Sequence, residues 1–181
     1  MTPEERAELL RIVKSVVKFG DFTLSSGKKS DFYIDCRLVT LNARGLLLTA
    51  RAMLEIIRPL RPVAVGGLAV GADPLSAGVA VESAREGDPI DAFIVRKEAK
   101  GHGTKKSIEG PPLARGARVI ALDDVVTTGG STVQAIERLR EEAGADVIAA
   151  VALVDREEGG KEALAAMGVP LHAVFRKSEL R

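Results

Sequence analysis

Hydrophobic residues follow two different patterns along this chain, and the clearer one begins after residue 62. There, short runs of Val, Ile, Ala and Leu alternate with segments in which apolar residues recur every three or four positions. The short runs lack polar alternation, which is typical of strands buried on both faces of a parallel sheet. The pattern predicts strands at 63–65, 92–95, 119–122, 147–154 and 171–175, and helices at 74–84, 131–143 and 161–167.

The first part of the chain is organised differently. Thr2-Pro-Glu-Glu5 is a capping box with proline at the first helical position, and apolar residues then recur at helical spacing. This predicts a helix from residue 3 to about 19, ended by Gly20. The next residues alternate loosely around turn-forming ones and predict an irregular hairpin of 22–24 with 32–35. Another helix is expected over 42–58.

The order of these elements predicts the fold class. Alternating strands and helices form an α/β domain with a parallel sheet, helices on both faces and right-handed crossovers. The 181 residues fit a single domain, 1–181, in which residues 1–40 form a small N-terminal helix-plus-hairpin hood. Ligands of such sheets bind beyond the carboxyl ends of the strands. The candidate site is therefore formed by the loops that follow residues 65, 95, 122 and 154.

Charge and composition narrow the classes of partner. Lys and Arg total 26 against 25 for Asp and Glu, so no basic excess indicates nucleic acid, and a phosphate site would have to be local. No stretch approaches the roughly 18 apolar residues of a membrane span. Cys36 is the only cysteine, which excludes an intrachain disulfide and suits a small packing residue. We expect a cytoplasmic protein without a nucleic-acid or membrane partner.

The segment 119–132 carries the strongest functional signal. An apolar strand ends in Asp123 and Asp124, and a Thr-Thr-Gly-Gly-Ser turn then opens a helix. Glycines let backbone N–H groups face an anion, hydroxyls add donors, and the helix N-terminus adds positive potential. The segment lacks the Gly-Lys-Ser/Thr of the usual nucleotide loop. An Asp turn with a Ser cap is the alternative, but the full string in its strand–turn–helix context favours an anion site.

This string resembles the phosphoribosyl-pyrophosphate (PRPP) signature of the type I phosphoribosyltransferases. The resemblance implies that family's parallel-sheet core, with Thr127–Ser131 on the 5-phosphate and the two aspartates facing the ribose 2- and 3-hydroxyls. It also implies Mg²⁺ that enters with the pyrophosphate and has no direct protein ligand. The implied PRPP-binding residues are Asp123, Asp124, Val125, Val126, Thr127, Thr128, Gly129, Gly130 and Ser131.

A second candidate is the long polar connection 96–116. Connections of this length are usually functional lids or disordered segments. Cations on a closing lid could neutralise a leaving pyrophosphate, whereas the alternative is a solvated charged loop. The segment resembles the mobile catalytic loop of the orotate phosphoribosyltransferases, which implies catalytic roles for its titratable residues. These residues are Arg96, Lys97, Lys100 and His102.

Two further segments resemble the same family, namely the hairpin 22–35 and the turn 155–160 after the last central strand. The resemblance implies that Arg156 binds orotate, with Thr127 and the backbone near Tyr33 and Ile34. Arginine can bind a carboxylate bidentately, although a surface ion pair with Glu157 or Glu158 is the alternative. The chain differs from this family at two positions where a lysine is common. Ser25 stands at the first, and Ala69-Val70-Gly71 replaces an aromatic-Lys-Gly sequence at the second.

The expected reaction is the transfer of the 5-phosphoribosyl group from PRPP to orotate, giving orotidine 5-phosphate and pyrophosphate. In the family the catalytic loop of one subunit serves its neighbour's site, so the resemblance implies a homodimer with a shared loop. Another type I enzyme acting on a purine or on uracil is one alternative, but those bases lack the carboxylate that Arg156 would bind. A non-catalytic PRPP-sensing regulator is the other, although no basic patch or helix-turn-helix segment supports it.

Overall fold

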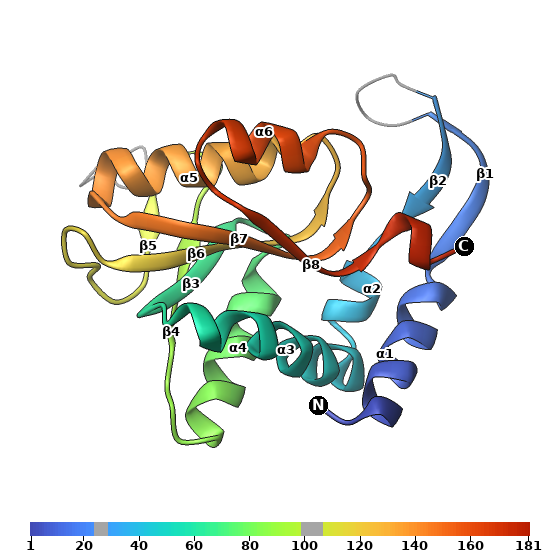
Figure 1. Cartoon of the computed structure of the whole chain (residues 1–181), viewed down its shortest axis with the longest axis horizontal. Helices are drawn as coiled ribbons and strands as arrows, with labels where there is room; N and C mark the ends of the chain where they lie inside the picture. The colour runs from blue at the N-terminus through green and yellow to red at the C-terminus, as the bar shows by residue number, and fades with distance from the viewer. Residues whose placement is uncertain (24–28, 99–106) are drawn as a thin grey trace.

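The computed structural model describes residues 1–23, 29–98 and 107–181, and a central sheet organises it (Figure 1). In this part of the chain the sheet contains β3 (Ala64–Leu68), β4 (Asp91–Val95), β5 (Ile108–Glu109), β6 (Arg118–Val126), β7 (Asp146–Asp155) and β8 (Leu171–Arg176). The spatial order is β5-β4-β3-β6-β7-β8. All neighbouring pairs are parallel except β4–β5, where the two-residue β5 runs antiparallel at the edge. The predicted strands are confirmed, and β5 is an addition inside the segment predicted as a loop.

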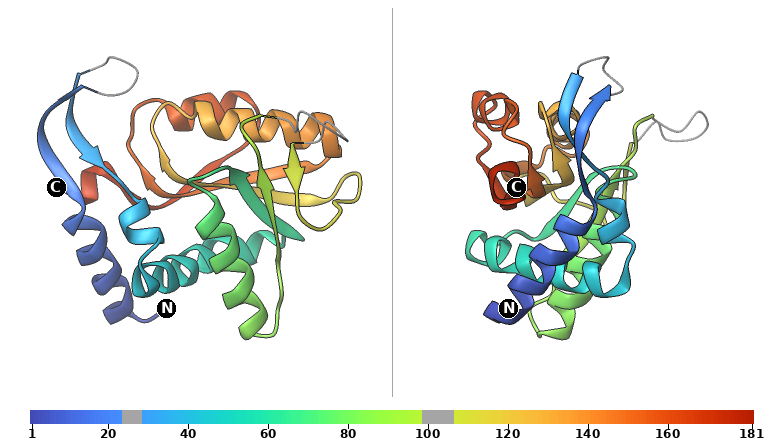
Figure 2. Two further views of the ribbon diagram at one scale, coloured as in Figure 1. Left: turned by 180° about the vertical axis from the view of Figure 1, so that it is seen from behind. Right: turned by 90° about the vertical axis from the view of Figure 1, so that its right-hand side faces the viewer.

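Helices cover both faces of the sheet, as the strand–helix alternation predicts (Figures 1 and 2). One face carries α3 (Ala43–Ile57) and α4 (Asp73–Arg85), and the other carries α5 (Gly130–Ala143) and α6 (Gly160–Ala166). Each face buries its own hydrophobic cluster, so the strands are apolar on both sides. Among the described residues, no helix combines the length and the apolar character needed to cross a bilayer.

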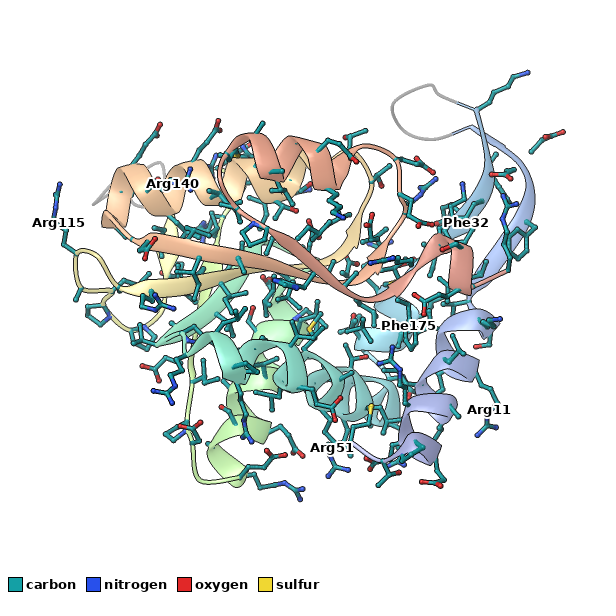
Figure 3. All side chains as sticks on the ribbon, in the orientation of Figure 1. Arg11, Phe32, Arg51, Arg115, Arg140 and Phe175 are labelled. Atoms are coloured by element: carbon teal, nitrogen blue, oxygen red, sulfur yellow. The ribbon has the colours of Figure 1, made fainter. Side chains whose placement is uncertain are left out.

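The N-terminal residues form an appendage at one end of the sheet. It consists of α1 (Pro3–Ser15), an antiparallel hairpin of β1 (Val17–Thr23) with β2 (Lys29–Ile34), and the one-turn helix α2 (Arg37–Thr40). The predicted capping box is present, since Thr2 and Glu5 exchange backbone-to-side-chain hydrogen bonds of 3.1 and 3.2 Å. The hairpin stands out from the body (Figure 1). Phe32 on β2 is fully buried where the hood meets the body (Figure 3).

The helix predicted over 3–19 is wrong at its end. α1 stops at Ser15, and Val17 already pairs with Ile34 across the hairpin. Valine satisfies an apolar helical spacing, but its β-branched side chain is equally suited to a strand, and the pairing partner decides. Gly20, predicted to end the helix, lies inside β1 with φ of 154°. The short α2 has no counterpart among the predicted elements.

Strand β6 continues four residues beyond its predicted end at Leu122. The pairing with β7 extends through Asp123, opposite Ala152, to Val126, opposite Asp155. The two aspartates therefore lie on the strand itself, and the turn begins only at Thr127. This extension fixes both carboxylates at the carboxyl edge of the sheet, where loops from neighbouring strands converge.

Candidate functional site

The turn between β6 and α5 encloses the first part of the site. Backbone and side chains of Val125–Ser131, with Asp123, line a hollow of about 200 Å³. Gly129 has φ of +84°, and an added Cβ would stand 3.3 Å from the backbone of Gly160, so only glycine suits the turn. Helix α5 begins at Gly130 with its free N–H groups at this hollow, and Thr128 and Ser131 are exposed there. The arrangement suits a phosphate.

The two aspartates differ in their hydrogen bonds. Asp123 accepts a bond of 2.7 Å from the Thr132 hydroxyl, and Asp124 accepts one of 2.9 Å from the Val125 N–H. Burial raises the pKa of Asp123 to about 7, the Thr132 hydroxyl opposes this rise, and the neighbouring Asp124 charge adds to it. Such carboxylates can accept hydrogen bonds from adjacent hydroxyls of a sugar.

A second hollow of about 280 Å³ adjoins the first. The loop after β3 forms one wall with Leu68–Gly71, and the aspartates form another. Both hollows are lined by Asp123 and Ser131, so they are neighbours at the same edge of the sheet. The Ala69–Val70 peptide bond is cis. Gly71 lets the loop approach, because an added Cβ would lie 2.6 Å from Asp124 Oδ1.

Arg156 follows β7 and lines neither hollow, but its backbone N–H donates to the Val126 carbonyl at 2.9 Å, and its side chain meets β2 of the hood. The residue is 5% exposed, and its guanidinium donates to Glu158 at 2.9 Å and to the Phe32 carbonyl at 3.3 Å. It also lies over the Phe32 ring, 5.4 Å from the centroid. The alternative prediction of an ion pair is confirmed for Glu158, although the pair is largely buried instead of lying on the surface.

The hood brings β2 to Arg156, and the contact is made by Phe32, which precedes the predicted Tyr33 and Ile34. Phe32 contacts Arg156 through both its carbonyl and its ring, whereas Tyr33 is exposed and Ile34 is buried. Lys177 Nζ lies 5.3 Å from the centre of the same ring and 3.3 Å from Glu158. The hydrophobic spacing of 32–34 predicted the strand but could not indicate which residue meets Arg156.

Of the four predicted catalytic-loop residues, Lys100 and His102 lie outside the described residues. Lys97 lines the second hollow, whereas Arg96 faces Glu109 with a separation of 3.6 Å. The carbonyls of Arg96 and Lys97 both accept hydrogen bonds from Arg138 on α5, at 2.6 Å for Lys97. At the other end of the segment, Ser107 N–H donates to Glu142 at 2.8 Å. Helix α5 thus holds both described ends.

Besides Phe32, two further residues of the site were not predicted. Thr132 supports Asp123, and its position one turn into α5 is the signal that could have indicated it. Arg37 lines the second hollow from α2. Its only sequence signal is the spacing from Asp35, which it contacts with two bonds of 2.8 and 2.9 Å. Cys36, predicted as a packing residue, is 1% exposed in the core.

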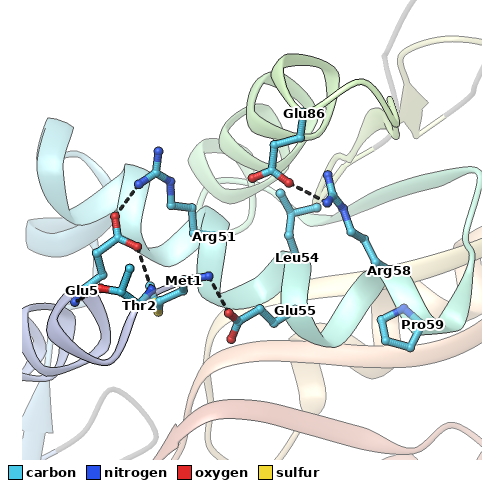
Figure 4. A pocket seen from close by; sticks show the side chains of 9 residues that line it. All are labelled: Met1, Thr2, Glu5, Arg51, Leu54, Glu55, Arg58, Pro59 and Glu86. Atoms are coloured by element: carbon cyan, nitrogen blue, oxygen red, sulfur yellow. Dashed lines mark hydrogen bonds and ion pairs between the residues drawn. The ribbon is translucent and has the colours of Figure 1, made fainter.

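The largest hollow, about 660 Å³, lies elsewhere, between α1 and the ends of α3 and α4 (Figure 4). Its charged residues are paired with one another. Arg51 bridges Glu5 to Glu82, Arg58 contacts Glu86 at 2.5 Å, and the Met1 amino group contacts Glu55 at 2.7 Å. These pairs join helices and present no convergent set of donors, so the carboxyl edge of the sheet remains the candidate site.

Comparison with known proteins shows the family to which the chain belongs. The phosphoribosyl transferase domain family matches residues 41–169. Orotate phosphoribosyltransferase of Thermosynechococcus vestitus is 52% identical over 97% of this chain and 92% of the relative. A crystal structure of Mycobacterium tuberculosis orotate phosphoribosyltransferase with Fe(III) dicitrate has a TM-score of 0.85 and 38% identity, covering 97% and 98% of the two chains. The complex of the M. tuberculosis enzyme with PRPP has a TM-score of 0.81 and 35% identity, with the same coverage.

Proposed function

The chain belongs to the orotate phosphoribosyltransferases, and from this premise we propose that it transfers the 5-phosphoribosyl group of PRPP to orotate. The bond between the ribose anomeric carbon and pyrophosphate breaks, and a bond from that carbon to orotate forms, giving orotidine 5-phosphate. The observation that carries the proposal is the grouping at one edge of the sheet of an anion-binding turn, two carboxylates and a buried arginine whose backbone bonds to Val126 at the start of that turn. The protein itself forms no covalent bond in this transfer, so its contribution to catalysis is mainly to position the substrates and to stabilise charge.

We place PRPP across the two neighbouring hollows, with its 5-phosphate in the first and its pyrophosphate in the second. Thr127–Ser131 bind the 5-phosphate through backbone N–H groups, hydroxyls and the N-terminus of α5. Asp123 and Asp124, which lie between the hollows, accept hydrogen bonds from the ribose hydroxyls. The pyrophosphate then occupies the second hollow, against the backbone of Leu68–Gly71. The shared lining supports this order, because the ribose of PRPP separates its two phosphate groups.

We propose that orotate binds beside Arg156. The guanidinium is oriented by Glu158 and by the carbonyl and ring of Phe32, and a fork fixed in this way can read a planar carboxylate. The orotate carboxylate competes with Glu158 for the arginine, and Lys177 can retain Glu158 when it is displaced. Thr127 and the backbone near Tyr33 and Ile34 complete the proposed base site.

Mg²⁺ is part of the proposal as a companion of PRPP. The second hollow offers the carboxylate oxygens of Asp123 and Asp124, and hard oxygen donors are what this ion prefers. We propose that the ion is held mainly by its substrate and by water, as the family resemblance implies. When bound, the ion supplies positive charge to the pyrophosphate.

Of the predicted catalytic segment 96–116, we propose that the part before Ser107 closes over the pyrophosphate, because β5 is paired with β4 and Ser107 is bonded to α5. Lys97 already lines that hollow, and Arg96, Lys100 and His102 are assigned to the same lid by the family resemblance. We also propose that the chain forms a homodimer in which each lid serves the partner's site. The cytoplasmic location remains a prediction from the sequence.

Turnover with alternative bases tests the proposed function. Purified protein, PRPP and Mg²⁺ are incubated separately with orotate, uracil and adenine, and nucleotide and pyrophosphate are quantified. The proposal predicts orotidine 5-phosphate and pyrophosphate in equal amounts, with orotate used far better than uracil because uracil lacks the carboxylate that Arg156 reads. Preferred use of uracil or adenine would identify a different enzyme of the class, and PRPP binding without turnover of any base would identify a regulator.

A further inference from the structure

We propose that Arg37 is an additional PRPP-binding residue, whose guanidinium contacts the pyrophosphate from the hood side of the second hollow. The inference rests on the proposed function and deepens it. Arg37 is the first residue of α2 and lines this hollow together with Val70 and Asp124. It thus extends the site onto an element that precedes the central sheet in the chain.

The loop opposite Arg37 creates the need for a cation. Its residues 69–73 read Ala-Val-Gly-Ala-Asp and contain no positive charge, and Val70 is 65% exposed at the hollow. The aspartates add negative charge to the same cavity. A bound pyrophosphate would therefore experience strong repulsion without compensating cations. Among the described residues that line the hollow, the cations are Arg37 and Lys97.

Arg37 is held in a defined orientation. Asp35 accepts from Nε at 2.8 Å and from Nη2 at 2.9 Å, and the Arg37 backbone N–H donates to the same carboxylate at 3.1 Å. This paired contact uses one edge of the planar guanidinium, and the Nη1 edge remains to meet a second anion. Asp35, with a smaller effect from Asp124, raises the pKa of Arg37, so the residue stays charged at all working pH values.

A purely structural role for the pair is less well supported. The Arg37 side chain is 58% exposed, and exposed ion pairs contribute little to stability. Lys97 belongs to the segment assigned to the lid, whereas Arg37 follows β2 and is anchored by Asp35. Arg37 therefore supplies a positive charge to the hollow that does not depend on lid closure. An arginine can also bind two phosphate oxygens at once, which a lysine cannot.

The test uses Arg37→Ala, Arg37→Lys and the double variant Arg37→Ala/Val70→Lys. Arg11→Ala is the matched control, because Arg11 lies on the exposed side of α1 and points away from the body (Figure 3). Calorimetry measures the affinity for Mg²⁺-pyrophosphate, and steady-state kinetics measure both KM values. Arg37→Ala is expected to weaken pyrophosphate binding and raise the PRPP KM by roughly 10- to 100-fold, the usual effect of losing a charge-assisted hydrogen bond.

The orotate KM should stay within about twofold, and Arg37→Lys should recover part of the pyrophosphate affinity because the charge returns without the fork. The double variant should bind pyrophosphate more tightly than Arg37→Ala, since the exposed position 70 lines the same hollow and would carry a new positive charge. Unchanged pyrophosphate affinity and PRPP KM in Arg37→Ala would overturn the inference. Absence of orotate turnover by the unaltered protein would instead contradict the proposed function, so the two failures are distinguishable.

Discussion

The ionised carboxylate of Asp123 lowers the stability of the fold, although the site needs it. Its carboxyl group is buried beside Asp124, and burial raises its pKa to about 7. A carboxyl pKa raised in the folded state adds stability at low pH, and this stability is lost as pH rises from the unfolded value toward and through about 7. At pH 8 the buried charge therefore destabilises the fold while it is ready to accept hydrogen bonds from ribose.

Asp123→Asn should consequently stabilise the protein at pH 8 and impair its use of PRPP. The amide removes the buried charge and can still accept from Thr132. We expect the Tm to rise by about 2–4 °C at pH 8, corresponding to roughly 1 kcal/mol, and this gain to be clearly smaller at pH 5. Thermal melts at both pH values provide the measurement. Asp146→Asn, at an exposed position on β7, is the control, and an identical gain at both pH values would contradict the assignment.

Site residues that are neighbours in the sequence could be predicted from the sequence alone. Asp123, Asp124 and the following hydroxyls stand together in one string, so their chemistry is visible without a structure. Arg37 and Phe32 reach the site through tertiary contacts, and neighbouring letters do not indicate which side chains a hood will bring to a sheet edge. The sequence also does not distinguish Glu157 from Glu158 as the partner of Arg156. In the fold Glu158 pairs with the arginine, and Glu157 accepts from Ser178 N–H at 2.9 Å.

At the scale of elements, the site depends on the close approach of β3 and its loop to β6. Gly67 in β3 makes this approach possible, because an added Cβ would lie 2.0 Å from the Leu122 carbonyl oxygen and 2.8 Å from Ala72 Cβ. Neither contact can relax without moving backbone or a packed helix. The loop that borders the second hollow is thus positioned by a glycine that contacts no ligand.

Gly67→Ala is expected to destabilise the fold by at least about 2 kcal/mol, since overpacking a close contact has effects of this size. Calorimetric melts should show a Tm lower by about 4–8 °C. Gly130→Ala is the matched control, because an added Cβ there meets no atom within 4 Å and alanine favours a helix. A Tm of Gly67→Ala equal to that of the control would show that the strands separate more easily than this packing implies.

Element boundaries were predictable where a chemical signal marks them. Thr2 and Asn42 both cap the helices expected to follow them. The boundary after Ser15 has no such signal, and the pairing of Val17 with Ile34 determined it. The extension of β6 through Asp123 is likewise a consequence of pairing with β7, since polar residues at a strand end favour a turn when considered alone.

For the whole molecule, alternation of strands and helices was sufficient to predict an α/β fold with both faces covered. The spatial order of the strands and the antiparallel β5 at the edge were not predicted, because they depend on crossovers and on contacts between distant segments. The same limit applies to the assembly. A lid that acts on a neighbouring subunit is implied by the family resemblance alone and needs its own test.

Mixed dimers provide that test. A Lys100→Ala subunit lacks a lid charge, and an Asp124→Asn subunit lacks a pocket carboxylate. If the lid acts across the interface, one site of the hybrid combines an intact lid with an intact pocket, and the other carries both defects. Activity should then exceed that of either parent, because loss of a transition-state charge contact typically reduces rate by about 100-fold or more. Hybrids detected by mass spectrometry without this recovery would place the lid in its own subunit's site.

The separate recognition of the two substrates is the central claim, and steady-state kinetics of Asp124→Asn and Arg156→Lys test it most directly. KM for PRPP and KM for orotate are measured in both variants against the unaltered protein. We expect Asp124→Asn to impair PRPP use while largely sparing the orotate KM, and Arg156→Lys to raise the orotate KM by roughly 10-fold or more while largely sparing the PRPP KM. Equal effects of Arg156→Lys on both substrates, or unchanged PRPP kinetics in Asp124→Asn, would contradict the account.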